Sequence, residues 1–158
     1  LAHSAETLAR LDGTLGEHGV TLGLEALNRF ETDLLNTAAE AVGLAEATGS
    51  DRIGVLLDSF HLNVEEKDLR AAIARTGRRL CHFHVSDNDR GVPGSGHVPW
   101  REVRAGLSEA SYDGWIVAEM FVRAGTPAGN DLSIWRDIEP DATDAARRAL
   151  AFLRETWG

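Results

Sequence analysis

The sequence predicts an α/β fold built on a parallel sheet, and three observations support this prediction. Short apolar segments alternate with longer segments whose apolar residues recur at helical spacing. The order is one helix followed by four strand–helix units, which is the pattern of parallel strands joined by helical crossovers. The strands are almost continuously apolar, as expected for a sheet that is buried on both faces. With 158 residues, the chain is long enough for one domain with its own core.

The first part of the chain supplies a leading helix and two strand–helix units. The side chain of Ser4 is placed to cap the first helix, and glycines end the two later helices. The predicted elements are a helix at 4–17, a strand at 20–27, a helix at 33–48 that Gly49 ends, a strand at 53–58, and a helix at about 65–75 that Gly77 ends.

The second part supplies two further units. Alternation along the third strand predicts that Cys81 and Phe83 face the helices, while His82 and His84 share the other face. The predicted elements are a strand at 79–86, a loop at 87–99, a helix at 100–110, a strand at 114–120, a polar loop to about residue 140, and a helix at 141–156.

Composition argues against several classes of protein. The net charge of −9 argues against a nucleic-acid binder, which needs a basic face. No apolar run approaches the ~20 residues that a membrane-spanning helix requires, so no membrane association is expected. The single Cys81 forms no internal disulfide, and the chain has no C-x-x-C zinc pattern. Together with the absence of a secretory signal pattern, this predicts a reducing cytoplasm as the compartment.

Each predicted strand carries a potential metal ligand at or near its carboxyl end, where sites form in parallel α/β folds. Asp58 alone would more often cap a helix, and His84 alone would more often be a hydrogen-bonded core residue. Glu25 and Glu119 are flanked by apolar residues, and a charge in such a run is rarely buried unless it is paired or metal-bound. The convergence of all four favours a site. Three carboxylates and one imidazole suit Mn²⁺, Mg²⁺ or Co²⁺ better than a structural Zn²⁺.

Three further residues follow these strands closely enough to line a substrate pocket. Glu31 lies six residues after Glu25, His61 three after Asp58, and Arg90 six after His84. The alternatives are a capping Glu, a surface His and a solvated Arg.

Four segments in order, LGLEALNRFETDLLNT, VLLDSFHLNVEE, CHFHVSDNDRGVPGSGHVPW and VAEMF with the later WRDI, resemble the ketose 3-epimerases. This family of D-tagatose and D-psicose (allulose) 3-epimerases lies within the xylose-isomerase-like TIM-barrel superfamily. The resemblance implies that Glu25, Asp58, His84 and Glu119 bind one divalent metal, with Mn²⁺ expected first and Co²⁺ or Mg²⁺ as alternatives. It also implies that Glu31, His61 and Arg90 hold the oxygens of a small sugar substrate.

The resemblance further implies epimerisation at C3 of a free ketose through a cis-enediolate. Of Glu25 and Glu119, one would remove the C3 proton on one face and the other would return a proton on the opposite face. Two alternatives stay open: another enzyme of the superfamily, such as a hydroxypyruvate or ketose isomerase or an inosose dehydratase, and a catalytically silent half-barrel.

The chain is short for this fold, because an eight-stranded barrel needs roughly 250 residues. The resemblance places residues 1–158 as a single partial TIM-barrel domain, the C-terminal half with strands five to eight, preceded by the fourth helix. Either the other half comes from elsewhere, or two halves associate, or the sequence is incomplete. A full-length member of the family is expected to form a homo-oligomer.

Overall fold

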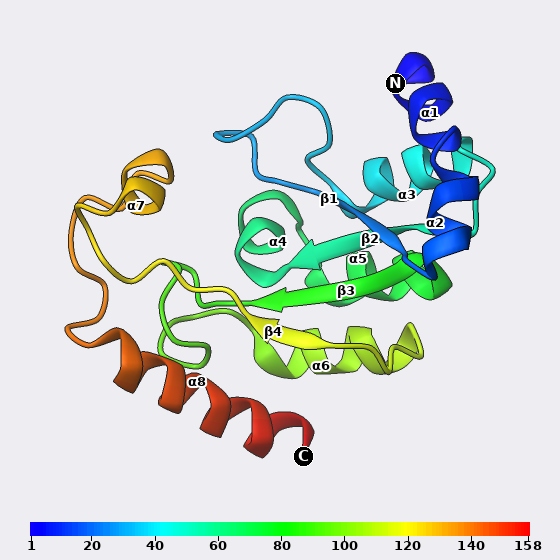
Figure 1. Cartoon of the computed structure of the whole chain (residues 1–158). Helices are drawn as coiled ribbons and strands as arrows, with labels where there is room; N and C mark the ends of the chain where they lie inside the picture. Colours follow the sequence, from blue (N-terminus) through cyan, green and yellow to red (C-terminus); the bar gives the residue numbers. More distant parts are fainter.

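A computed structural model describes all of residues 1–158, and its centre is a sheet of four parallel strands in the order β1-β2-β3-β4 (Figure 1). Each strand pairs in parallel with the next one along the chain. This confirms the predicted α/β fold with a parallel sheet. The strands are β1 (Leu22–Glu25), β2 (Ile53–Asp58), β3 (Leu80–Val85) and β4 (Ile116–Ala118).

Three helices, α3, α5 and α6, pack against one face of the sheet, and α8 lies beside β4 (Figure 1). The longest helix, α8, has 16 residues, and none of the helices combines the length and apolar character that crossing a bilayer requires. The helices are α1 (Ala2–Ala9), α2 (Asp12–His18), α3 (Ala38–Ala47), α4 (Ser59–Glu65), α5 (Leu69–Thr76), a 3₁₀ turn η1 (Gly77–Arg79), α6 (Trp100–Glu109), α7 (Pro127–Asp131) and α8 (Ala142–Trp157).

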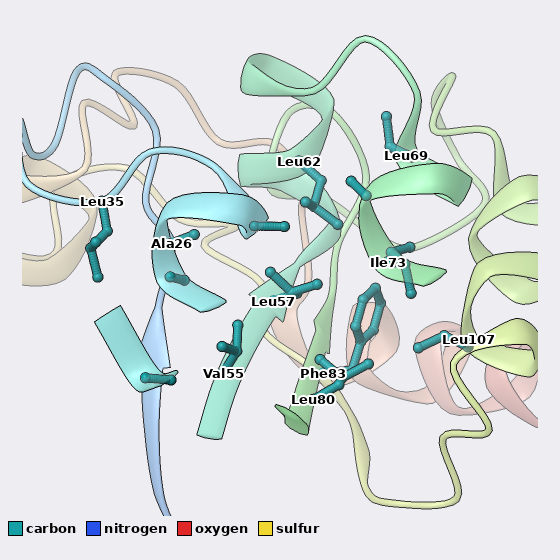
Figure 2. Packing of buried hydrophobic residues seen from close by; sticks show 14 of the residues in the cluster. Ala26, Leu35, Val55, Leu57, Leu62, Leu69, Ile73, Leu80, Phe83 and Leu107 are labelled. Atoms are coloured by element: carbon teal, nitrogen blue, oxygen red, sulfur yellow. The ribbon is translucent and has the colours of Figure 1, made fainter. Parts of the chain in front are cut away.

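The hydrophobic core lies between the sheet and these three helices (Figure 2). Val55 and Leu57 of β2 are fully buried, as is Phe83 of β3, and Ile73 of α5 and Leu107 of α6 pack against them. The opposite face of the sheet is more open, since Val117 on β4 is 38% exposed. The core therefore holds the strands from one side and leaves their other face and carboxyl ends available for a site.

The prediction for Cys81 is wrong. The register between β2 and β3 shifts at Val55 and Leu56, so that Leu80 rather than Cys81 enters the core. The Cys81 thiol instead lies close to Gly23 and Gly54, where an added Cβ would come within 3.2 and 2.8 Å of the sulfur. An irregularity of this kind reverses the alternation of side chains for the residue concerned.

Several element boundaries differ from the prediction. The leading helix is two helices, and α2 begins at Asp12, which accepts a hydrogen bond from the Ser50 hydroxyl. The helix predicted from residue 33 begins at Ala38, because Thr37 and Glu40 form a capping box there. The loop expected after β2 is helix α4, since Asp58 ends the strand and caps the helix at once.

Candidate metal and active site

Four side chains meet at the carboxyl ends of the four strands. Glu25 ends β1, Asp58 ends β2, His84 lies one residue before the end of β3, and Glu119 directly follows β4. Asp58 is the register partner of His84. One potential ligand atom from each residue lies within 4.8 Å of the other three. The structure therefore brings together the whole predicted ligand set.

Glu25 is a partly buried carboxylate, and few polar contacts offset the loss of its solvation. Its Oε1 is buried and has no hydrogen-bond partner. Burial, followed by the neighbouring charges of Glu119 and Asp58, raises the pKa of Glu25 to about 7. A cation placed beside such a buried carboxyl group would stabilise its ionised form.

Asp58 performs the capping role considered in the sequence and also faces the site. Its Oδ1 accepts a hydrogen bond of 2.8 Å from the Phe60 backbone N–H, at the start of α4. Its Oδ2 lies 2.7 Å from Nη1 of Arg90. Burial raises the pKa of the fully buried Asp58 carboxyl, and Arg90 opposes that rise. One carboxylate oxygen of Asp58 thus caps helix α4, and the other faces the site.

His84 and Glu119 form the other side of the cluster. Nδ1 of His84 lies 3.4 Å from Oε1 of Glu119, and this Nδ1 is buried without a hydrogen-bond partner. The interaction with His84, with Arg90 contributing, lowers the pKa of Glu119, and Glu119 in turn raises the pKa of His84. The imidazole and the carboxylate therefore stabilise each other's charged forms.

This donor set fits a divalent cation. Two buried atoms, Oε1 of Glu25 and Nδ1 of His84, have no hydrogen-bond partner among the protein atoms. When the three carboxylates are ionised and His84 is neutral, as a metal ligand must be, the single charge of Arg90 leaves two negative charges, which one divalent ion would balance. Oxygen-rich sets of this kind suit hard cations such as Mn²⁺ and Mg²⁺.

The three predicted substrate residues also lie at this site. Arg90 is 3% exposed, adopts a left-handed backbone with φ of 67°, and has its guanidinium 3.7 Å from Glu31. His61 is 2% exposed, and its Nε2 lies 2.9 Å from Nη2 of Arg90 and 3.9 Å from Oε1 of Glu25. Neither His61 nor Arg90 is therefore a surface residue.

A cavity of about 380 Å³ lies beside Arg90, and Glu31 and Arg90 line it, whereas none of the four candidate ligands does. This volume lies within the range of small-ligand sites. Phe60 and Trp135 contribute apolar surface to its wall. The Arg90 guanidinium lies over Phe60, 4.0 Å from the ring centre, and 5.2 Å from that of Phe121.

Sequence reasoning missed several residues that shape this site. Phe60 and Phe121 stack on Arg90, and Asn28 contacts both Glu31 and His61. All three lie within three residues of a predicted ligand, and that proximity is the one sequence signal that points to them.

Comparison with known proteins identifies the class. A profile of the xylose isomerase-like TIM-barrel family matches residues 1–156, and the chain belongs to this family. Within it, the chain is 38% identical to a D-psicose 3-epimerase of Enterocloster bolteae over 162 residues, covering 99% of the chain and 54% of the relative. It is 42% identical to a D-psicose 3-epimerase of Agrobacterium fabrum over 145 residues, covering 89% of the chain and 50% of the relative.

Solved structures support the same family assignment. A crystal structure of D-psicose 3-epimerase in the presence of D-fructose matches with a TM-score of 0.93 and 38% identity, covering 98% of this chain and 55% of that one. The chain thus spans about half the length of the relatives it matches. Its fold is half of a TIM barrel, as the sequence predicted.

Proposed function

We propose that this chain carries the metal-binding and proton-transfer half of a ketose 3-epimerase. The main support is the convergence of Glu25, Asp58, His84 and Glu119 at four strand ends, with buried atoms of Glu25 and His84 left without hydrogen-bond partners. The similarity to D-psicose 3-epimerases supports the choice of reaction. We propose Mn²⁺ as the ion, with Co²⁺ or Mg²⁺ as alternatives, because the donor set is mostly oxygen.

The residues divide the chemistry between them. A divalent cation held by the four ligands would stabilise negative charge developing on the sugar oxygens. One of Glu25 and Glu119 removes the proton from C3, and the other delivers a proton to the opposite face, which inverts the centre. Arg90 and His61 orient sugar oxygens, and Glu31 holds the Arg90 guanidinium.

We further propose that residues 1–158 form one partial domain, corresponding to strands five to eight of a complete barrel. The open face and the unpaired outer edges of β1 and β4 support this, because exposed strand edges invite pairing. We propose the cytoplasm as compartment and a homo-oligomer for the complete barrel.

The experiment is to load the chain with Mn²⁺, measure the metal content after desalting, and incubate it with D-fructose in deuterated water. We expect about one ion per chain, deuterium at C3 and formation of D-psicose. An aldose product with deuterium at C2, together with deuterium at C1 of the recovered ketose, would instead identify an isomerase. Bound metal without exchange at any carbon would support a silent half-barrel, and a chain that retains no metal would refute the site.

A further inference from the structure

A single hydroxyl group joins the carboxyl ends of β2 and β3. Oγ of Ser59 donates a hydrogen bond of 2.7 Å to the carbonyl oxygen of Ser86 and accepts one of 3.0 Å from the backbone N–H of the same residue. Both serines are fully buried. Ser59 directly follows Asp58, and Ser86 lies two residues after His84. The hydroxyl bridge therefore lies just beyond the strand ends that carry two of the candidate ligands.

This bridge takes the place of backbone pairing that the fold cannot supply. Asp58 and His84 are the last register pair of β2 and β3, because the chain turns into α4 at Ser59. Buried backbone N–H and C=O groups need hydrogen-bond partners, and the Ser59 hydroxyl provides one for each of the two groups of Ser86. It thus extends the attachment of β3 to the β2 side beyond the end of their backbone ladder.

The other edge of β3 is attached at the same level. The carbonyl oxygen of Val85 accepts a hydrogen bond of 3.1 Å from the backbone N–H of Glu119. The end of β3 is therefore tied on one side to the residue that follows Asp58 and on the other side to Glu119 itself. Loss of the Ser59 hydroxyl would free β3 from the β2 side only, which is the side that faces Asp58.

We propose that Ser59 is a positioning residue for the metal site, because its hydroxyl fixes the spacing between Asp58 and His84 and thereby sets the affinity for a divalent cation. The bridge itself is a contact of this structure, and its consequence for the metal rests on the proposed function. Replacing residues that hold metal ligands in place typically lowers metal affinity by about 10- to 100-fold.

The test is a titration of the whole chain with Mn²⁺ at one fixed pH, comparing the parent with Ser59→Ala. Alanine is a good helix former, and the Asp58 cap uses the Phe60 N–H, so α4 should persist in this variant. We expect the Kd for Mn²⁺ to rise at least about tenfold. Ser59→Thr keeps a hydroxyl at this position and should recover most of the affinity. A Kd within twofold of the parent in folded Ser59→Ala would overturn the proposal.

A matched control is Ser86→Ala. The Ser86 hydroxyl is as deeply buried as that of Ser59, but it has no hydrogen-bond partner. This variant removes one buried oxygen from the same strand end and keeps the backbone groups that Ser59 contacts. It should bind Mn²⁺ like the parent and be at least as stable, because burying an unpaired hydroxyl is unfavourable. An equal loss of affinity in both variants would assign the effect to packing and overturn the role of the bridge.

Amide hydrogen exchange without metal gives a second, independent measurement. The Ser86 N–H should exchange faster in Ser59→Ala than in the parent, whereas the Glu119 N–H should keep its protection. If Ser59→Ala does not fold, Ser59→Cys replaces it with the same expectations, because a thiol is a weak hydrogen-bonding group. Unchanged protection of Ser86 would overturn the proposal. A parent chain that binds no Mn²⁺ would instead refute the proposed function, and the exchange of Ser86 would still decide whether Ser59 holds the strand end.

Discussion

The affinity of the site for Mn²⁺ should rise with pH because Glu25 must lose a proton before it can bind a cation. Burial and the neighbouring carboxylates raise the pKa of Glu25 to about 7 in the folded protein. The group is then about 90% protonated at pH 6 and about 10% at pH 8. The apparent Kd for Mn²⁺ should therefore fall about tenfold from pH 6 to pH 8. Asp58 and His84, whose pKa values are also raised, act in the same direction.

The assay is a titration of the chain with Mn²⁺ at pH 6, 7 and 8, followed by the electron paramagnetic resonance signal of the free ion. Buffers that do not bind metal and a fixed ionic strength keep the comparison clean. His84→Ala should abolish tight binding, while Glu6→Gln, an exposed substitution on α1, should leave the whole curve unchanged. A Kd that stays within twofold across this range would refute the reasoning, because a Glu25 with an ordinary pKa would already be ionised at pH 6.

Three further substitutions test the chemistry and the scaffold. Glu119→Gln should lower epimerase turnover by about 10²–10⁴-fold with an unchanged circular dichroism spectrum, and full activity would remove Glu119 from the mechanism. Phe83→Ala should lower the free energy of unfolding in urea by about 3–5 kcal/mol, because the ring is fully buried in the core. A loss below 1 kcal/mol would contradict that packing. Asp87→Ala should cost about 3 kcal/mol, because its carboxylate accepts hydrogen bonds from the N–H groups of Asn88, Gly94 and Val98 and from the Trp100 indole. Faster amide exchange confined to residues 87–99 would locate the effect, and protection equal to that of the parent would contradict it.

The sheet and the convergence of the four candidate ligands were predictable because both depend on local pattern. A carboxylate flanked by apolar residues, as at Glu25, is unusual, and it can be recognised from the sequence without knowledge of the tertiary structure. Cys81 was not predictable, because its direction depends on a register shift between β2 and β3 at Val55 and Leu56 that alternation within one strand does not encode. The roles of Phe60 and Asn28 were also hidden, because their contacts with Arg90 and His61 join different strand–helix units.

The same topology explains how a half-barrel could hold all four ligands of the proposed metal site. Each proposed ligand lies on or directly after a strand that is hydrogen-bonded to its neighbour, so the positions of Asp58 and His84 are set by their mutual register and by the core beneath them. Arg90, although it follows β3, contacts Asp58, Glu119 and His61 from other units of the same half. The proposed metal binding would therefore depend on contacts within these 158 residues, whereas the proposed sugar turnover would depend also on whatever covers the open face of the sheet. The two should separate experimentally: adding a complementary half-barrel should change the KM for the sugar while leaving the Kd for Mn²⁺ unchanged.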